Sequence, residues 1–479
     1  MSNLRDISVY NTMTRRKEKF APLEEGKVGI YVCGVTPYNE PHIGNARPFV
    51  TWDAIRRFFS SCGYEVRYIQ NFTDVDDKII RTSHEQKITW KEVADKYIDA
   101  YFKAMDALNV RRADAYPRVS DTMPEIIEMV EGLIEKGYAY EMDGDVCYSV
   151  EKFGGYGKLS GRSLDDMMAG ARVEVDERKR NPMDFVLWKA AKPGEPSWDS
   201  PWGKGRPGWH IECSAMSLKY LGRTFDFHGG GSDLIFPHHE NEIAQSQAYC
   251  GDENCFARYW VHNGFITIDE QKMSKSLHNF LTVAEILEKY PGEVVRFFIL
   301  QTHYRSPLDF SDERLKDAAA GLSRLKTASD NAEELLKRDG GADTAVALKK
   351  SAGEAKEKFF EAMADDFNTA LAISYLFAVA KEINVYYNDV VNHGTPFDKE
   401  NLSSAKADFD EMAGIIGILE SKDEAASSDE DAKIDALVEE RLAARKAKNW
   451  ARADEIRDML KAQGIIIEDS ASGSRWKRA

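Results

Sequence analysis

Two strand–helix–strand units place the strongest constraint on how this chain folds. In the first unit, the apolar and β-branched run 27–33 predicts a buried strand, and a loop rich in Gly and Pro follows it. Apolar residues at helical spacing then begin near Ile43 and stop near Gly63, and the run 65–73 predicts a second strand. A helix that connects two strands in this way makes them parallel, and parallel sheets bind ligands at the carboxyl ends of their strands.

The second unit has the same order of elements. The run 224–231 predicts a strand that ends in glycines, and a helix is expected from Pro237 to about Gly251. The run 259–268 predicts another strand, and a loop that contains lysines and a helix at 282–300 follow it. Together the two units predict one parallel α/β sheet with an insertion between its halves.

The chain changes in composition beyond the predicted sheet. Ala, Leu, Lys, Glu and Asp recur at helical spacing and predict a helical bundle, whereas a polar, acidic stretch predicts a flexible linker. A helical stretch and the short strand-like run IIIED follow. The predicted segments are 1–114 with 206–310 for the sheet domain, 115–205 for the insertion, 311–420 for the bundle, 421–432 for the acidic linker and 433–479 for a C-terminal module.

Composition limits the class of protein. A hydrophobic fraction of 43% and a charged fraction of 30% are typical of a soluble globular protein, and no apolar run is long enough to span a membrane. Six cysteines in 479 residues do not form a disulfide framework, so we expect a reducing, cytoplasmic location. Four of them lack any partner pattern and are interpreted as structural or incidental: Cys62, Cys147, Cys250 and Cys255. The net charge of −16 excludes a protein whose whole surface coats nucleic acid, but it allows a local basic face.

Two short motifs carry groups that can bind phosphate. His42, Gly44 and Asn45 stand between the first strand and its helix, where free N–H groups and the helix dipole attract anions. Taken alone, this motif is explained equally well by an ordinary loop histidine. Lys272 and Lys275, in the string KMSKS after a late strand, can neutralise a polyphosphate, although solvated lysine loops are far commoner.

Residue types that bind zinc lie far apart in the sequence. Cys33 ends the first strand, Cys213 stands on an expected helix, and His238 and Glu242 are four apart and therefore on one helix face. His239, three residues before Glu242, serves equally well by periodicity. On spacing alone, two buried cysteines and an acidic surface helix explain these residues better than a metal site does.

Longer stretches resemble a known family. An HIGH-like string after an early strand and KMSKS after a late one resemble the class I aminoacyl-tRNA synthetases. More closely, the chain is similar to the cysteinyl-tRNA synthetase family, strongly over about 7–310 and more weakly in the tail. The stretches that carry the similarity are YVCGVTPYNEPHIGNARPFV, YIQNFTDVDDKII, GRPGWHIECSAM, FHGGGSDLIFPHHENEIAQS, KMSKSLHNF and EERLAARKAKNWARADEIRDMLKAQGIIIED.

The resemblance implies a fold and a reaction. The fold is a Rossmann-like parallel-sheet catalytic domain split by a connective insertion, followed by a helical bundle and a small anticodon-binding module. The family activates L-cysteine with ATP to cysteinyl-adenylate and transfers it to the 3′ end of tRNA(Cys), so positioning and charge stabilisation dominate. Mg²⁺ is expected with ATP but without a dedicated protein site, because Asp74, Asp76 and Asp77 are explained by a charged turn and a helix cap.

The resemblance also implies roles for individual residues. In the family one zinc is held by residues that match Cys33, Cys213, His238 and Glu242, which selects His238 over His239. Zinc separates cysteine from serine because it binds a thiolate much better than a hydroxyl. The other matches are His42, Asn45, Lys272 and Lys275 for catalysis, His42, Asn45, Gly230, Asp233 and Lys275 for ATP, Thr73 and Trp209 for the amino acid, and Trp476 as an anticodon candidate.

One departure from the family pattern concerns Asn45, which replaces the second histidine of the HIGH string. An amide can still donate a hydrogen bond to a phosphate, but it carries no proton charge. We expect activity to survive this replacement.

The C-terminal segment is locally basic. Residues 433–479 contain 11 Lys and Arg against 8 Asp and Glu, whereas residues 420–431 contain six acids and one lysine. Trp476 lies within the string RWKR, where an aromatic ring among cations can stack on a nucleic-acid base. A frayed basic terminus explains the same string about equally well.

Two other functions fit part of the sequence. A ligase of the same fold that joins cysteine to an amino sugar would lack the anticodon module, yet residues 311–479 follow the catalytic half here. A zinc-dependent RNA-binding protein that lost catalysis would not need Lys272, Lys275 or His42. We therefore favour the synthetase, and we expect a monomer with no membrane segment.

Overall fold

The computed structural model describes residues 5–163, 176–268, 271–272, 281–339, 346–420, 429–462, 465–470 and 473–478. The chain forms two compact units, Met1–Leu419 and Glu420–Ala479. Among the described residues, no helix is both long enough and apolar enough to cross a membrane.

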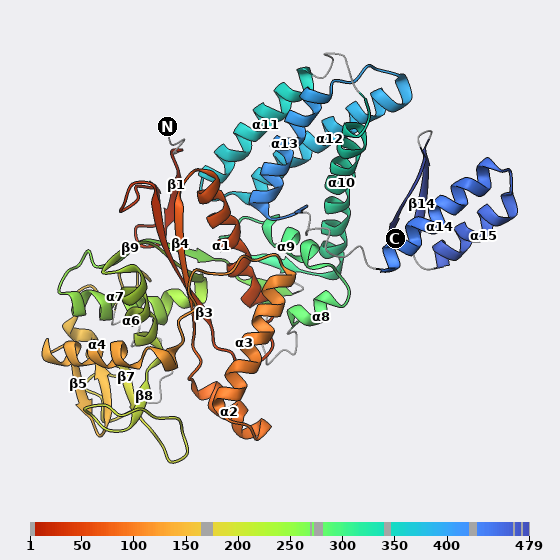
Figure 1. The fold of residues 1–479 in the computed structure, drawn as a ribbon. Helices are drawn as coiled ribbons and strands as arrows, with labels where there is room; N and C mark the ends of the chain where they lie inside the picture. Colours follow the sequence, from red (N-terminus) through yellow and green to blue (C-terminus); the bar gives the residue numbers. More distant parts are fainter. Residues whose placement is uncertain are drawn as a thin grey trace. The chain divides into compact units, whose positions relative to one another are not determined.

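A four-stranded parallel sheet forms the centre of the first unit (Figure 1). Helix α1 (Ile43–Ser61) connects two of its strands, and α7 (Glu240–Cys250) connects the other two. The strands lie in the order β10 (Phe256–Asn263), β9 (Thr224–Gly231), β3 (Lys27–Val35) and β4 (Glu65–Phe72). The prediction of one parallel α/β sheet built from two strand–helix–strand units is confirmed.

The chain leaves the sheet in opposite directions from its two central strands. β3 and β9 pair in parallel, with Ile30 opposite Phe227 and Val32 opposite Gly229. From β3 the chain continues through α1 to β4 at one edge, whereas from β9 it continues through α7 to β10 at the other. A crevice forms beyond the carboxyl ends of the strands at such a reversal, and α/β proteins bind their ligands there.

The segment between β4 and β9 adds helices and a second sheet. Its four strands are antiparallel and lie in the order β5-β6-β7-β8, and Figure 1 shows β5, β7 and β8 beside α4. The sequence showed only scattered aromatics here and did not predict this sheet. The elements are α2 (Asp77–Gln86), α3 (Trp90–Ala107), α4 (Met123–Glu135), β5 (Ala139–Met142), β6 (Asp145–Tyr148), β7 (Phe185–Ala190), β8 (Gly205–Pro207) and α6 (Trp209–Leu221).

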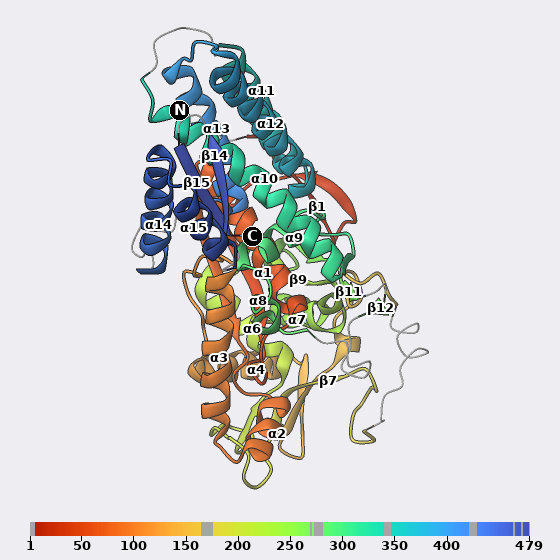
Figure 2. The same ribbon diagram turned by 90° about the vertical axis from the view of Figure 1, so that its right-hand side faces the viewer.

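Four helices form the bundle that follows the sheet region. They are rich in buried Ala and Leu at helical spacing, as the composition predicted, and they lie side by side in both views (Figures 1 and 2). The bundle comprises α10 (Asp312–Leu336), α11 (Val346–Ala364), α12 (Thr369–His393) and α13 (Lys399–Ile416). Smaller elements complete the unit: β1 (Ser8–Asn11), β2 (Arg16–Lys19), β11 (Ile266–Ile268), β12 (Gln271–Lys272), α8 (Val283–Leu287), α9 (Gly292–Leu300) and β13 (Leu308–Phe310).

The second unit is a helical pair with a hairpin. Its small apolar core includes Ile434, Val438, Ile456 and Leu460. Its elements are α14 (Asp429–Lys446), α15 (Trp450–Ala462), β14 (Ile465–Ser470) and β15 (Gly473–Arg478). We predicted one helical stretch, but positive φ at Lys448 ends the first helix before Trp450 starts the second.

Three element boundaries differ from the predictions. The predicted strand 259–268 is two strands, because the chain breaks at Gly264 and β11 joins β13 in a separate sheet. The predicted helix 282–300 is interrupted at Pro291, which cannot donate the backbone hydrogen bond of a helix interior. The helix expected from Pro237 is preceded by a kink at Phe236, whose backbone is extended, and α7 starts only at Glu240.

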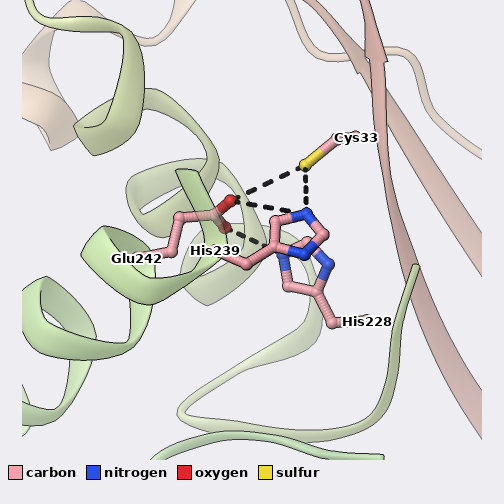
Figure 3. A group of neighbouring side chains, drawn as sticks. All are labelled: Cys33, His228, His239 and Glu242. Atoms are coloured by element: carbon pink, nitrogen blue, oxygen red, sulfur yellow. Dashed lines mark hydrogen bonds and ion pairs between the residues drawn. The ribbon is translucent and has the colours of Figure 1, made fainter. Parts of the chain in front are cut away.

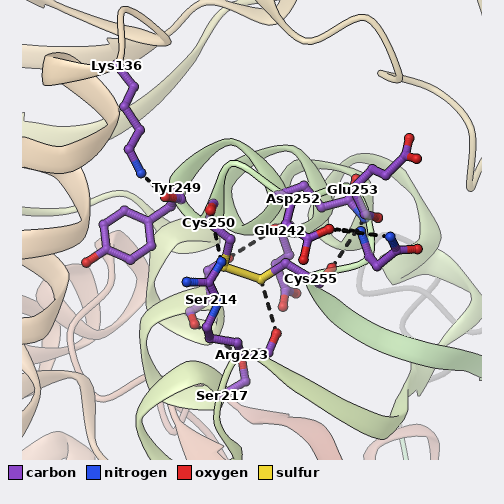
Figure 4. The surroundings of a disulfide bond; sticks show 12 residues. Lys136, Ser214, Ser217, Arg223, Glu242, Tyr249, Cys250, Asp252, Glu253 and Cys255 are labelled. Carbon is purple, nitrogen blue, oxygen red and sulfur yellow. Dashed lines mark hydrogen bonds between the residues drawn. A yellow bond between two sulfur atoms is a disulfide. The ribbon is translucent and has the colours of Figure 1, made fainter.

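Two sequence interpretations need correction. Part of the expected linker 421–432 is helical, since α14 starts at Asp429. Cys250 and Cys255, expected to have no partner, are joined by a disulfide that links the end of α7 to the residue before β10 (Figure 4). The two cysteines face each other because Gly251 turns the chain back at the end of α7 with positive φ.

One buried carboxylate holds three arginines where the sheet region meets the bundle. Asp53 of α1 is fully buried, and Arg56, Arg57 and Arg296 approach its oxygens to 2.7, 2.6 and 2.8 Å. These arginines hold the pKa of Asp53 well below its usual range although burial opposes this. Arg57 and Arg296 also donate to carbonyls at the end of α13, so the cluster ties the bundle to α1.

The first prediction concerns this cluster. Asp53→Asn leaves three buried arginines without their carboxylate, so we expect the free energy of unfolding to fall by about 3–5 kcal/mol. Asp410→Asn, which removes the partially exposed partner of Lys406 in α13, serves as the matched control and should cost less than about 1 kcal/mol. Urea unfolding followed by circular dichroism measures both. Equal losses in the two variants would contradict the assigned role of Asp53.

Candidate functional site

A cavity of about 370 Å³ opens at the carboxyl ends of β3 and β9, where the chain reverses direction. It brings together residues that the sequence analysis chose from distant motifs. Five of the predicted site residues line it besides Cys33: His42, Asn45, Trp209, Gly230 and Asp233. The cavity therefore joins the start of α1, the glycine end of β9 and the start of α6 in one space.

His42 and Asn45 cap the helix that begins at this cavity. His42 Nδ1 accepts a hydrogen bond from the Asn45 backbone N–H at 3.3 Å, and Asn45 Oδ1 accepts from the His42 N–H at 3.3 Å. Because Nδ1 accepts, the proton of the neutral imidazole is on Nε2. The Asn45 amide oxygen is likewise used, so its NH₂ group is the donor that it offers. Both residues thus stand at a helix N-terminus, where the dipole favours an anion.

The glycine-rich end of β9 forms one side of the cavity. A Cβ at Gly230 would come within 2.8 Å of Leu234 and 3.0 Å of His239, so a side chain at this position would have to displace both neighbours. Asp233 is exposed beside it, in a short 3₁₀ turn. The backbone here can approach a ligand closely, with a carboxylate at the rim.

A buried cluster of sulfur, imidazole and carboxylate groups adjoins the cavity. The Cys33 thiol donates to Cys213 Sγ at 3.7 Å. This hydrogen bond lowers the pKa of Cys213 to about 6, whereas burial raises the pKa of Cys33. His238 Nε2 lies 3.0 Å from Glu242 Oε1, and Cys33 Sγ lies 3.6 Å from the same oxygen.

Charges of opposite sign stabilise each other inside this cluster. Burial disfavours both charged groups, yet the Glu242 carboxylate raises the pKa of His238 to about 10. His228 and His238 in turn lower the pKa of Glu242 to about 2 against the effect of burial. The carboxylate therefore stays ionised in the interior and is available as a ligand.

Two groups of four residues can each hold a metal ion. One comprises Cys33, Cys213, His238 and Glu242, and the other Cys33, His228, His239 and Glu242. Within each group the ligand atoms lie within 4.8 Å of one another, and all of these residues are buried. Figure 3 shows the second group, with Cys33 from β3 and His228 from β9 facing His239 and Glu242. Thiolate, imidazole and carboxylate are the ligands that zinc takes in proteins, so the donor set fits this ion.

The predicted amino-acid pocket lies next to this cluster. The Trp209 indole, 42% exposed, stacks on the His238 ring with 4.2 Å between centroids. Thr73 is buried and donates to Glu212 Oε2 at 2.9 Å. Trp209 lines the cavity, whereas Thr73 does not.

Three predicted residues are described only in part or not at all. The backbone of Lys272 belongs to β12 and pairs with Thr267, and Lys275 lies outside the described residues. The backbone of Trp476 belongs to β15, opposite Ile467, but its side chain lies outside the described part.

The acidic run after β4 has structural partners. Asp76 caps α2 by accepting from the Lys78 N–H at 2.8 Å, and Asp74 accepts from the Ser120 hydroxyl at 2.6 Å. Asp77 pairs with Arg206 at 2.5 Å. Each of the three carboxylates therefore has a partner within the described structure, and a turn and helix cap account for them.

Sequence reasoning missed the histidines around the cluster. His262 Nε2 lies 2.8 Å from His239 Nδ1, and His210 Nδ1 lies 2.9 Å from His238 Nδ1. Burial lowers the pKa of both His210 and His262 to about 3, so they are neutral. A usable signal was present, since five of the ten histidines of the chain fall between His210 and His262.

Comparison with known proteins finds similar proteins and matching family models along almost the whole chain. A family model described as tRNA synthetases class I (C) catalytic domain matches residues 19–320, a DALR domain model matches 358–420, and a cysteinyl-tRNA ligase anticodon binding domain model matches 427–476. The chain is 55% identical to a cysteine–tRNA ligase of Heliobacterium modesticaldum, which covers 99% of this chain and 100% of the relative. It is 54% identical to that of Desulfitobacterium hafniense, over 98% and 99%.

Solved structures of lower sequence identity show the same fold. Methionyl-tRNA synthetase of Mycobacterium tuberculosis in complex with methionyl-adenylate superposes with a TM-score of 0.60 at 17% identity, over 81% of this chain and 89% of that one. This similarity supports the fold alone. The parallel sheet with its ligand cavity, the three family matches and the full-length relatives lead to one conclusion: the chain belongs to the cysteine–tRNA ligase family of class I tRNA synthetases.

Proposed function

We propose that this chain joins L-cysteine to the 3′ end of tRNA(Cys) at the expense of ATP. The observation that carries the proposal is that one cavity connects the N-terminus of α1 with the buried Cys/His/Glu cluster. The first site suits a polyphosphate and the second suits a thiol, and both chemical groups belong to the substrates of this reaction.

The reaction takes place in two steps. The cysteine carboxylate oxygen attacks the α-phosphorus of ATP, and the bond to pyrophosphate breaks. A ribose hydroxyl at the 3′ end of the tRNA then attacks the carbonyl carbon of the adenylate, its proton is lost, and AMP leaves. Neither step needs a protein nucleophile, so the protein contributes positioning and charge stabilisation. Mg²⁺ is expected to arrive with ATP.

His42 and Asn45 are proposed to bind the phosphates. Both side chains stand at the N-terminus of α1 and line the cavity, where an imidazole, an amide NH₂ and the positive end of the helix dipole suit an anion. In this arrangement Asn45 of the HIGH-like string would donate a hydrogen bond to a phosphate, which an uncharged amide can do. Gly230 and Asp233 are proposed to contact the adenosine, and Lys272 and Lys275 the phosphates.

Zinc is proposed to be held by Cys33, Cys213, His238 and Glu242. Two sulfur donors suit zinc better than the single sulfur of the alternative group. His228 is better explained as an outer partner, because its Nε2 approaches the second Glu242 oxygen at 2.8 Å. Bound zinc is a soft Lewis acid that favours a thiolate over a hydroxyl and would thereby select cysteine over serine.

Thr73 and Trp209 are proposed to line the amino-acid pocket. Trp209 covers the His238 ring and is also part of the cavity wall, so it lies between the thiol end and the phosphate end. The Thr73 hydroxyl is oriented by its donation to Glu212 Oε2.

The second unit is proposed to recognise the anticodon. Residues 433–479 of this unit are locally basic, and Trp476 is the predicted stacking residue. Trp450, at the first position of α15, has a side chain that is 59% exposed, which makes it a second aromatic surface for a base. A cytoplasmic location and a monomeric state stay predictions from the sequence.

The second prediction tests the proposed function. The purified protein should catalyse ATP–pyrophosphate exchange that depends on cysteine, and it should transfer radiolabelled cysteine to tRNA(Cys). His42→Asn keeps a side chain that caps a helix but removes the imidazole donor, so we expect exchange to slow by about 100-fold. His393→Ala, an exposed histidine at the end of α12, is the control and should exchange at the wild-type rate.

The outcomes separate the competing functions. Absence of exchange in the wild-type protein would overturn both the proposed tRNA ligase and a ligase that joins cysteine to an amino sugar. Exchange without transfer to tRNA would instead favour a ligase that joins cysteine to another acceptor.

The third prediction concerns the metal. Cys213→Ala and His238→Gln should lose bound zinc on dialysis and should raise the KM for cysteine, because each removes a proposed ligand. His228→Gln removes only an outer partner of Glu242. It should keep all four proposed ligands and lower the zinc affinity by about 10- to 100-fold. Cys147→Ala, another fully buried cysteine, is the matched control and should keep zinc and KM unchanged. Zinc is measured by atomic emission.

The alternative group of ligands predicts a different pattern. If zinc stays in Cys213→Ala and disappears in His228→Gln, the group that contains His228 and His239 holds the metal instead.

A further inference from the structure

Arg47 connects α1 to two separate loops through main-chain carbonyls. It stands two residues after Asn45, and its side chain is 1% exposed. Its two terminal nitrogens donate to five carbonyl oxygens at 2.5 to 3.3 Å. The acceptors are Gly264, Phe265, His303, Tyr304 and Ser306.

The charge of Arg47 has no carboxylate partner among the described residues. Burial lowers the pKa of Arg47 to about 10, so the guanidinium is still charged at neutral pH. A buried cation without an acid is costly to a fold, and carbonyl dipoles compensate it only when several point at it together. The planar fork of arginine, with its five N–H donors, is the side chain that can collect so many acceptors at once.

One of the two loops that Arg47 holds forms part of the cavity wall, and the other packs against it. Gly264 and Phe265 line the cavity between β10 and β11. The Gly264 N–H donates to Tyr304 O at 2.8 Å, and a Cβ on Gly264 would come within 2.5 Å of Ser306 O. The loops therefore pack backbone against backbone, and Arg47 donates hydrogen bonds to the carbonyls that converge between them.

We propose that Arg47 is a positioning residue for the nucleotide. It fixes the distance between the start of α1, with His42 and Asn45, and the cavity floor at Gly264–Phe265. The same floor leads into β11 and on to β12, which contains Lys272. The proposal rests on the proposed function of this cavity as the ATP site. Arg47 itself acts through these elements, since both terminal nitrogens of its guanidinium donate to protein carbonyls.

Arg296 offers a matched control. It is also fully buried, and it donates to the carbonyls of Leu108, Asn109 and Ile416. Its ion pair with Asp53 lies on the bundle side of α1, and it does not line the cavity. A lysine at either position keeps the charge but loses the fork, so the two substitutions make the same chemical change at different places.

The fourth prediction compares Arg47→Lys with Arg296→Lys in cysteine-dependent ATP–pyrophosphate exchange. For Arg47→Lys the KM for ATP should rise by about 10- to 100-fold, because small displacements of positioning groups have effects of this size. Its KM for cysteine and its zinc content should stay within about two-fold, since the proposed zinc ligands are not among the groups that Arg47 contacts. For Arg296→Lys the melting temperature should fall while both KM values stay at the wild-type level.

A second route to the same displacement guards against misfolding of the first variant. Gly264→Ala forces the two loops apart while residue 47 stays an arginine, and it should raise the KM for ATP selectively as well. The proposal is overturned if both variants lower the melting temperature and leave the KM for ATP unchanged, or if the KM values for ATP and cysteine rise equally. Absence of exchange in the wild-type protein would instead refute the proposed function, so the two failures are distinguishable.

Discussion

The parallel pairing of β3 with β9 is the interaction on which the rest of the structure depends. It joins two strand–helix–strand units that a long insertion separates in the sequence, and it does so with only three paired positions, Ile30 to Val32. Because the chain turns away from this pair in opposite directions, the carboxyl ends of both strands are left uncovered. Cys33 near the end of β3 and Gly230 at the end of β9 therefore line one cavity, and each half contributes part of its wall.

Sequence patterns predicted the sheet and the bundle because these depend on local periodicity. The strand 27–33 and the helix after it are set by apolar spacing that needs no knowledge of the partner strand. The break at Gly264 was not predictable in the same way, since the run 259–268 is uniformly strand-like. Tertiary hydrogen bonds to the 303–306 loop divide it. Likewise, the linker boundary moved to Asp429 because an acidic composition is compatible with a helix start.

Sequence analysis identified some residues of the site but could not choose between others. His42, Asn45 and Gly230 were found from motifs, and the structure places all three around one cavity. Spacing could not choose between His238 and His239, and the structure shows why: both imidazoles approach Glu242 Oε1, at 3.0 and 4.0 Å. Their other nitrogens differ in partner, His210 for one and His262 for the other. Such outer contacts depend on three-dimensional packing that no spacing rule encodes.

Helix α1 contributes both to the cavity and to the buried polar contacts that hold it in place. Its first turn presents His42 and Asn45 to the cavity, its second carries the buried Arg47, and Asp53 further along holds three arginines. The same helix buries large apolar side chains such as Trp52, Phe58 and Phe59, and the charged side chains buried beside them need polar partners in fixed geometry. Those partners come from the cavity floor, the sheet region and the end of α13. Arg47 therefore connects the start of the helix to the cavity wall, whereas the partners of Asp53 fix the helix against the bundle.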